Sequence, residues 1–387
     1  MSGAKHNDIL MENSDITHPL QHIRLLLVAP YAVSGIVDPL FRGIETHFDT
    51  MRIIDTHELL VKYLFIAQSF SPSLPRWKSR SAARLAAYTR KPIAFMQRTK
   101  ALQAKVVKLS GSVDAIFQIS STFRTWVDKP NIPYYMYMDC TSKLGEKYTP
   151  QSAFPIEYRE DRYRLEGETY RNALRVFAAN DVCAESLVQL YGVDADRVVN
   201  VGFGVNLEKL PDSRTYFGNA NILFVTTDFN RQRGQAIIDA FRVLRKRHPE
   251  LTLTVVGKDI TGDGIRGMNR IPHEELRKLY AEHGIFVMPA MLGGAQSTLE
   301  AMAYGCACIV ERANMHLSGV IRHEQNGLLV DTSDPEVFAG VLDQAVCDAD
   351  LRHRIGEQAQ TSISDNYSWE QVACRIAAEI KRAAEGT

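Results

Sequence analysis

The stretch Met291-Leu-Gly-Gly-Ala-Gln-Ser-Thr-Leu-Glu-Ala-Met-Ala-Tyr-Gly305 decides how this sequence is interpreted. Two apolar runs of strand length flank it, at 285–289 and 306–310. Between the pair Gly293 and Gly294 and the terminal Gly305, the pattern predicts a helix of about two to three turns. A strand, a glycine-rich turn and a helix N-terminus form an anion site, because free backbone N–H groups point outward and glycines let a phosphate approach.

Glu300 lies one to two turns into this helix, among small and apolar residues. A carboxylate there can accept two hydroxyl hydrogen bonds, as a ribose would offer. The alternative is a buried helix of an α/β sheet that carries one solvent-facing Glu.

Length and composition limit the possible classes of protein. A chain of 387 residues suits two domains rather than one core. Lysine plus arginine equals aspartate plus glutamate, at 45 each, so no overall charge favours nucleic acid. The six cysteines are scattered, which indicates reduced thiols of a cytoplasmic protein rather than a metal site. The polar first 22 residues predict a flexible tail without the apolar core of a signal peptide.

Strand and helix patterns alternate along the chain, starting with the apolar run 24–30. This rhythm predicts mostly parallel sheets covered on both faces. We expect an α/β protein with a first domain at 23–205, a second at 206–368 and a C-terminal helix at 369–387. A dinucleotide-binding dehydrogenase is disfavoured, because only Gly35 follows the first strand where G-x-G-x-x-G would be needed. Two candidate anion loops, 227–234 and 291–297, follow strands of the second domain.

The second half of the sequence resembles retaining GT-B glycosyltransferases of the family-4 type, also called glycosyltransferase group 1. The matching stretches are 201–206, 222–257, 272–280, 293–305 and 326–330. The resemblance covers about residues 197–372, and the first half fits only through its alternation of strands and helices. It implies two Rossmann-like domains that face a central cleft, with the donor in the second domain and the acceptor in the first.

The resemblance also implies roles for particular residues. The helix of this family carries two glutamates with seven residues between them. The second corresponds to Glu300, expected to hold the donor ribose, whereas the first corresponds to Leu292, which cannot hydrogen-bond a sugar. Backbone amides would face the donor at the start of the helix, from Gly293, Gly294, Ala295, Gln296 and Ser297. The family's phosphate-binding cations correspond to Arg231 and either Gln232 or Arg233, although two solvated loop arginines are the plain alternative.

The resemblance thus implies the transfer of a sugar from a UDP- or GDP-sugar to an acceptor hydroxyl, with retention of configuration. Arginines and helix-terminal amides would stabilise the leaving diphosphate. We expect no metal and no further cofactor, because no D-x-D-type acidic cluster accompanies these loops. Asp139, at a strand's C-terminal end, is the candidate to orient or deprotonate the acceptor hydroxyl, or else a strand-end cap. Gly35 would let a loop of the first domain approach the diphosphate.

Two other classes of function remain open. One is a related enzyme on the same fold, a sugar phosphorylase or a nucleotide-sugar epimerase. The other is a non-catalytic GT-B partner subunit, for which Leu292 gives some support.

Residues 59–113 contain no Asp or Glu. Eleven basic residues lie among apolar ones: Lys62, Arg76, Lys78, Arg80, Arg84, Arg90, Lys91, Arg98, Lys100, Lys105 and Lys108. The region from Ser79 to Leu109 predicts helix, with a break at Pro92. Either these are surface helices with solvated basic faces, or this half docks on an anionic membrane surface at the inner face of the membrane, or on an anionic acceptor. The acceptor itself is expected to be a carbohydrate or a lipid-linked molecule.

Overall fold

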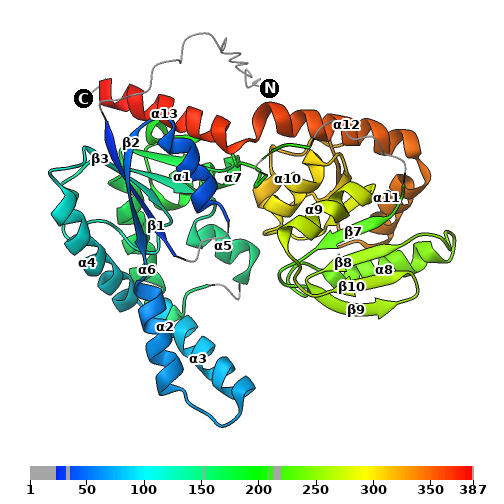
Figure 1. The fold of residues 1–387 in the computed structure, drawn as a ribbon, viewed down its shortest axis with the longest axis horizontal. Coiled ribbons are helices and arrows are strands. Elements are labelled where there is room, and N and C mark those ends of the chain that lie inside the picture. The colour runs from blue at the N-terminus through cyan, green and yellow to red at the C-terminus, as the bar shows by residue number, and fades with distance from the viewer. Residues whose placement is uncertain (1–22, 32–34, 151–152, 208, 212–218, 386–387) are drawn as a thin grey trace.

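The computed structural model describes residues 23–31, 35–150, 153–207, 209–211 and 219–385. It shows two α/β domains that lie side by side (Figure 1). The tail expected at 1–22 lies outside the described residues, as do residues 212–218 in the predicted turn between the domains.

The first domain is built on a six-stranded sheet in the order β2-β1-β3-β4-β5-β6, parallel throughout. Its strands are β1 Arg24–Pro30, β2 Asp49–Asp55, β3 Ala115–Ile119, β4 Tyr134–Met138, β5 Arg175–Ala178 and β6 Val198–Asn200. Its helices are α1 Val37–Glu45, α2 His57–Gln68, α3 Leu74–Thr89, α4 Pro92–Leu109, α5 Ser142–Tyr148, α6 Ile156–Arg171 and α7 Asp181–Tyr191, with the 3-10 turn η2 Ala195–Arg197. Every residue of β3 and β4 is buried, because helices cover both faces of the sheet.

The second domain has a seven-stranded sheet in the order β13-β12-β11-β7-β8-β10-β9. Its strands are β7 Ile222–Val225, β8 Leu253–Val256, β9 Lys258–Gly262, β10 Ile265–Met268, β11 Ile285–Met288, β12 Ala307–Glu311 and β13 Leu328–Val330. Its helices are α8 Gly234–Arg245, α9 His273–Glu282, α10 Ala295–Ala303, α11 Pro335–Cys347 and α12 Ala349–Asn366, with the 3-10 turn η3 Met315–Leu317. The antiparallel pair β9–β10 extends the sheet at one edge and was not expected from the sequence.

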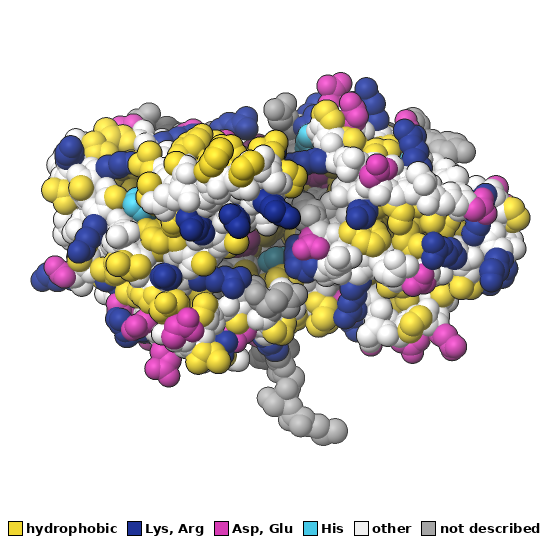
Figure 2. Space-filling model, turned by 90° about the horizontal axis from the view of Figure 1, so that it is seen from below, with side chains coloured by type: hydrophobic (Ala, Val, Ile, Leu, Met, Phe, Trp, Pro, Cys, Tyr) yellow, Lys and Arg dark blue, Asp and Glu magenta, His cyan; other side chains and the backbone are white. Residues whose placement is uncertain are grey.

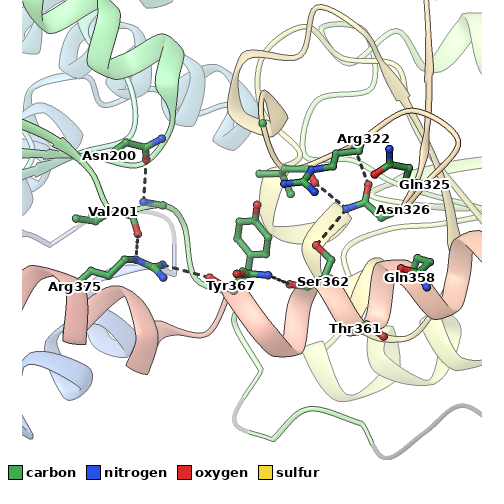
Figure 3. A pocket seen from close by; sticks show the side chains of 14 residues that line it. Asn200, Val201, Arg322, Gln325, Asn326, Gln358, Thr361, Ser362, Tyr367 and Arg375 are labelled. Carbon is green, nitrogen blue, oxygen red and sulfur yellow. Dashed lines mark hydrogen bonds between the residues drawn. The ribbon is translucent and has the colours of Figure 1, made fainter. Parts of the chain in front are cut away.

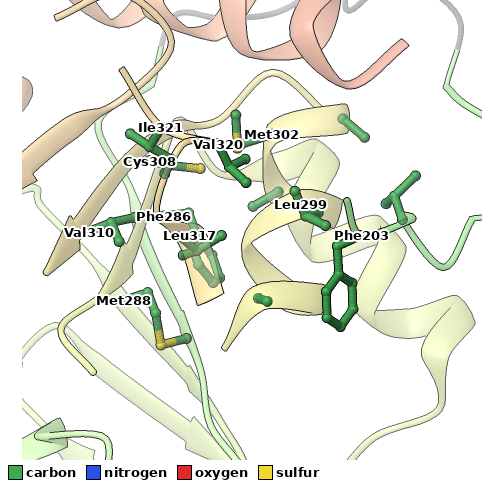
Figure 4. Packing of buried hydrophobic residues seen from close by; sticks show 14 of the residues in the cluster. Phe203, Phe286, Met288, Leu299, Met302, Cys308, Val310, Leu317, Val320 and Ile321 are labelled. Carbon is green, nitrogen blue, oxygen red and sulfur yellow. The ribbon is translucent and has the colours of Figure 1, made fainter. Parts of the chain in front are cut away.

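The stretch 291–305 forms a loop and the helix α10, as expected. α10 lies between β11 and β12, whose residues are all buried. Figure 4 shows its Leu299 and Met302 packed among side chains of both strands, with Phe203 of the domain linker at one side. This packing fixes the helix axis, so that its N-terminus lies at the C-terminal edge of the sheet.

The final helix, α13 (Trp369–Glu385), returns to the first domain and packs on α1. The contact is close: a Cβ at Gly43 would lie 2.8 Å from the Cβ of Ala373. The linker is held there too, since Arg375 Nε donates to the carbonyl of Val201 at 2.8 Å (Figure 3). A pocket of about 470 Å³ at this junction has Arg322 on one side and Arg375 on the other. None of the candidate catalytic or donor-binding residues named from the sequence lines it.

The acid-free stretch forms three helices rather than the two expected. α2 and α3 make a hairpin that protrudes from the first domain, whereas α4 packs against the domain through Phe95, Leu102 and Val106 (Figure 1). None of the described helices is both long and apolar enough to cross a membrane.

Candidate active site

The loop before α10 takes a backbone shape that requires glycine. Gly293 and Gly294 have φ values of +92° and +77°, in the left-handed region that side chains rarely adopt. A Cβ at Gly294 would also overlap the Met288 side chain at the end of β11. The first amides of α10 are therefore presented from a fixed turn at the sheet's C-terminal edge, which is the geometry of an anion site.

The turn η3 holds this loop from the other side. Asn314 Nδ2 donates to the carbonyls of Ala290 and Gly293, at 2.6 and 3.1 Å. The Gly293 N–H donates to Nδ1 of His316 at 3.1 Å. Burial lowers the pKa of His316, and nearby Arg231 lowers it further against the opposing charge of Asp139. Nothing in the sequence pattern pointed to His316, because its partners lie in other elements.

Arg231 lies beside the glycine loop, as the sequence predicted for a phosphate-binding cation. Its guanidinium Nη1 donates to the carbonyl of Leu292 at 3.0 Å. A Cβ at Gly293 would lie 3.4 Å from the same nitrogen. Asp228 is the nearest carboxylate, 3.7 Å from Nε, and is half exposed. The remaining guanidinium N–H groups therefore lie next to the amides at the start of α10.

Arg233 has other partners. Its Nη1 donates to Glu311 Oε2 at 3.2 Å and to the Thr332 hydroxyl at 2.6 Å. Glu311 is buried, so this pair ties the start of α8 to the end of β12. Contact of Arg233 with a phosphate stays a prediction, and its charge is already balanced by Glu311.

Gln232, the other candidate for the second cation position, is buried and holds its own loop. Its Oε1 accepts hydrogen bonds from the Thr226 hydroxyl at 2.5 Å and the Thr227 N–H at 3.0 Å. Its Nε2 lies 3.9 Å from the Met288 sulfur, and an uncharged amide supplies no charge to a ligand.

Glu300 is buried, with a side chain 5% exposed. Its Oε1 accepts a hydrogen bond from His273 Nε2 at 3.0 Å, and this bond raises the pKa of His273. The solvent-facing alternative considered for Glu300 is therefore wrong. A buried carboxylate in contact with a half-exposed histidine fits a binding role or a structural one.

A cavity of about 1000 Å³ joins the two domains at Glu300. Glu300, His273 and Arg270 line it from the second domain, and Gly35 and Arg42 from the first. Gly35 has a φ of +42°, and a Cβ there would lie 2.8 Å from the Asn206 side chain of the linker. The structure thus brings Gly35 and Glu300 to one cleft.

The side chains of the first turn of α10 face the protein. Gln296 Oε1 accepts from the Asn206 N–H at 3.1 Å, and its Nε2 donates to the Gly204 carbonyl at 2.7 Å. Ser297 donates to the carbonyl of Gly294 at 3.1 Å, and Ala295 is buried. Only the backbone amides of these three residues remain for an anion.

Asp139 follows β4 in the first domain and lines a separate cavity of about 320 Å³. Hydroxyls gather around the buried Glu166 in its wall: Ser121, Ser142 and Tyr170 donate to Oε1 at 2.7, 2.9 and 2.8 Å. This polar pocket was missed from the sequence, since Glu166 lies in a helix of unremarkable polar composition. The charge of Asp139 acts to raise the pKa of His316, so Asp139 lies within electrostatic reach of the turn that holds the glycine loop.

Among the described residues, the side chains that approach one another as metal ligands would are His248, Asp343 and Cys347. None of the three lines the cavities at Glu300 and Asp139. The expectation of a metal-independent reaction stays a prediction.

Comparison with known proteins agrees with this geometry. Residues 208–362 match the family described as glycosyl transferases group 1. A D-inositol 3-phosphate glycosyltransferase of Paenarthrobacter aurescens is 27% identical over 259 residues, which are 59% of this chain and 63% of the relative. One from Corynebacterium urealyticum is 32% identical over 113 residues, 29% of this chain and 26% of that one. The chain thus aligns with less than two thirds of these relatives.

Solved structures share the whole architecture. Sucrose-phosphate synthase of Thermosynechococcus elongatus has a TM-score of 0.67 at 14% identity, over 94% of this chain and 100% of that one. Anabaena HepE in complex with UDP-glucose has a TM-score of 0.61 at 14% identity, over 93% of this chain and 100% of that one. The fold is of the GT-B type, and the match to the glycosyl transferases group 1 family covers residues 208–362.

Proposed function

We propose that this protein transfers a sugar from a UDP- or GDP-sugar to an acceptor hydroxyl, with retention of configuration and without a metal. The observation that carries the proposal is the pair of sites on α10. Arg231 and the glycine loop lie at its start, and the buried Glu300 lies further along it. About 9 Å of helix separates Gly294 from Glu300, so one nucleotide can contact both.

Each end of α10 suits one part of a nucleoside diphosphate. The loop amides and the Arg231 guanidinium would bind the two phosphates and stabilise the charge that grows as the glycosidic bond breaks. The Glu300 carboxylate would accept hydrogen bonds from the ribose hydroxyls. These cationic and amide groups would stabilise the leaving diphosphate, as a metal ion does in other reactions that release a phosphate. We therefore propose that the reaction needs no metal.

The acceptor would bind in the first domain, in the pocket of Asp139 and Glu166. Asp139 would orient the acceptor hydroxyl from the face that the leaving phosphate vacates. Attack from that side retains the configuration, and it needs no second carboxylate as a nucleophile, unlike most retaining glycoside hydrolases.

The test begins with binding. Thermal shift with UDP, GDP and ADP, each with and without EDTA, should show stabilisation by at least one of the first two that EDTA leaves unchanged. Hydrolysis and transfer are then measured with a panel of nucleotide sugars. A non-catalytic partner subunit would hydrolyse none of them. Products that need inorganic phosphate would indicate a phosphorylase, and an epimerised nucleotide sugar would indicate an epimerase.

We further propose that the α2–α3 hairpin docks on an anionic membrane surface, which suits a lipid-linked acceptor better than a soluble carbohydrate. Its exposed apolar side chains are Leu60, Tyr63, Leu64, Phe70 and Leu74, each more than half exposed. Exposed basic residues accompany them, at Lys62, Arg76, Lys78, Arg80 and Arg84. Figure 2 views the molecule from the hairpin's side, and hydrophobic and basic side chains lie next to one another there.

Other side chains hold the two helices of the hairpin together. The ring of Phe65 on α2 contacts that of Tyr88 on α3, at a centroid distance of 5.7 Å. Trp77 Nε1 also donates to the Ile66 carbonyl at 2.6 Å. An apolar face beside basic residues matches an interface with anionic lipid, where each basic residue near the surface contributes about 1 kcal/mol.

Co-sedimentation with vesicles of phosphatidylcholine, with and without phosphatidylserine, tests the docking. Binding should require the anionic lipid and fall at high salt. The variant Tyr63→Ser with Leu64→Ser should bind less, whereas Val243→Ser, an equally exposed change on the second domain, should bind as the wild type does. Absence of binding at low salt would remove the membrane and leave a soluble acceptor.

A further inference from the structure

His316 lies next to the glycine loop, and the proposed function leaves its chemistry unused. It lies in η3, two residues after Asn314, and both residues hold Gly293 through its backbone N–H and carbonyl. The Asn314 side chain also accepts the N–H groups of His316 and Leu317, at 3.0 and 3.2 Å. The imidazole is therefore fixed relative to the glycine loop.

The hydrogen bond from Gly293 decides which ring nitrogen carries the proton. Nδ1 accepts the Gly293 N–H, so Nδ1 has no proton of its own. Burial keeps the ring neutral by lowering its pKa, and Arg231 acts in the same direction. A neutral ring with a bare Nδ1 must carry its proton on Nε2. His316 thus presents one donor, the Nε2–H.

That donor has no partner within the described part of the chain. Nε2 of His316 is buried, and no acceptor lies within hydrogen-bonding distance. A buried polar group without a partner is energetically costly, so such groups are rare unless a ligand completes them. The charges that act on the ring are Arg231, on the diphosphate side, and Asp139, on the acceptor side. The transferred sugar has to lie between these two sides.

The neighbouring Leu292 supplies a second argument. Its side chain is apolar and cannot hydrogen-bond a sugar. The Leu292 carbonyl accepts from Arg231, and the next residue, Gly293, is the one that His316 holds. The loop therefore offers a sugar no side-chain hydrogen bond at position 292, and the unused His316 donor is fixed next to it.

We propose that His316 Nε2–H donates a hydrogen bond to an acceptor oxygen of the transferred sugar, and so determines which sugar is bound. This rests on the proposed function. The contact has the opposite polarity to that of a glutamate, since a carboxylate only accepts. The favoured donor sugars therefore present a carbonyl, carboxylate or hydroxyl oxygen to this position, and a sugar deoxygenated there is disfavoured.

Two substitutions test the roles of the two ring nitrogens of His316 separately. His316→Asn keeps an acceptor near the place of Nδ1 for the Gly293 N–H but does not reach the place of Nε2. His316→Gln extends an amide N–H toward the place of Nε2. Dissociation constants are measured by calorimetry for the nucleoside diphosphate that stabilises the wild type and for its nucleotide sugar.

His316→Asn should weaken nucleotide-sugar binding roughly three- to tenfold, the effect of one neutral hydrogen bond, and leave the diphosphate unchanged. His316→Gln should retain most of the sugar affinity. In the Asn variant, a further Leu292→Glu change should restore part of the lost sugar affinity, with a changed preference among sugars.

Equal losses for the diphosphate and the nucleotide sugar would overturn the proposal and make His316 a support of the loop. Wild-type sugar affinity in His316→Asn would overturn it as well. Failure of the proposed function has a different signature, because the wild-type protein would then bind neither the diphosphate nor the nucleotide sugar.

Discussion

Replacing Arg233 by alanine should destabilise the second domain, whatever it does to the donor. Arg233 donates to Glu311, whose side chain is 5% exposed, and to Thr332. Without Arg233, the Glu311 carboxylate still accepts hydrogen bonds from the N–H groups of Thr332 and Ala313, at 3.0 and 3.1 Å, and from the Thr332 hydroxyl. The loss is therefore one hydrogen-bonded charge pair rather than the whole solvation of the carboxylate.

The magnitude follows from that count. A hydrogen bond to a charged group contributes about 1.5–3 kcal/mol. For a domain of this size, 1 kcal/mol shifts the melting temperature by about 2–4 °C, so Arg233→Ala should melt roughly 3–12 °C lower. Differential scanning calorimetry without ligand measures this directly.

A control and a rescue make this prediction specific. Arg242 lies on the same helix with both members of its ion pair more than half exposed, so Arg242→Ala should change stability by less than about 0.5 kcal/mol. Adding Glu311→Gln to Arg233→Ala removes the unpaired charge and should recover part of the loss. If Arg233→Ala had the same melting temperature as Arg242→Ala and the wild type, the Arg233–Glu311 ion pair would not be what stabilises the start of α8.

Three further changes separate binding, chemistry and stability. Glu300→Gln should weaken binding of a ribonucleoside diphosphate and hardly affect the 2′-deoxy analogue; equal losses in calorimetry would indicate a structural Glu300. Asp139→Asn should lower the rate of sugar transfer at least tenfold, measured by steady-state kinetics, while the donor dissociation constant, measured by titration, stays within twofold (about 0.4 kcal/mol). The Glu300 hydrogen bond raises the pKa of His273 above 6.5. The charged His273–Glu300 pair stabilises the fold fully below pH 6.5, and this contribution is lost as pH rises through the raised pKa of His273. His273→Gln should therefore lower the melting temperature more at about pH 5.5 than at about pH 8.5.

The repeating backbone pattern could be predicted because it is local. Apolar runs and glycines at helix ends marked the parallel strands and α10, and the structure confirms an α/β protein with two Rossmann-like domains. The pair β9–β10 was not predicted, because its exposed residues, such as Lys258 and Asp259, follow no apolar pattern. The helix expected as a separate terminal element packs on α1, a contact that depends on Gly43 and that no local pattern reveals.

Side-chain partnerships could not be predicted, because they join residues far apart in the chain. Arg231 and Arg233 are equivalent in sequence as loop cations. Only the structure shows that the second is paired with Glu311, 78 residues away, whereas the first faces the glycine loop. His316 could not be identified from the sequence for the same reason, since its partner Gly293 and the charges of Arg231 and Asp139 come from three separate segments.

The acid-free stretch shows why a count of charges does not define a surface. Eleven basic residues between 59 and 113 led to the hypothesis that this half docks on an anionic surface. The structure divides them, because Arg98 on α4 points inward and donates to the buried Asp55 at 2.9 Å. It lies on the same helix as the exposed Lys100 and Lys105, yet it cannot reach a membrane. Arg98→Gln should therefore lower stability and leave vesicle binding unchanged, whereas Arg76→Gln with Lys78→Gln on α3 should weaken vesicle binding and leave the melting temperature unchanged. If Arg98→Gln lowered vesicle binding in a protein that still melted as the wild type does, the division of this stretch into an inner and an outer set would be refuted.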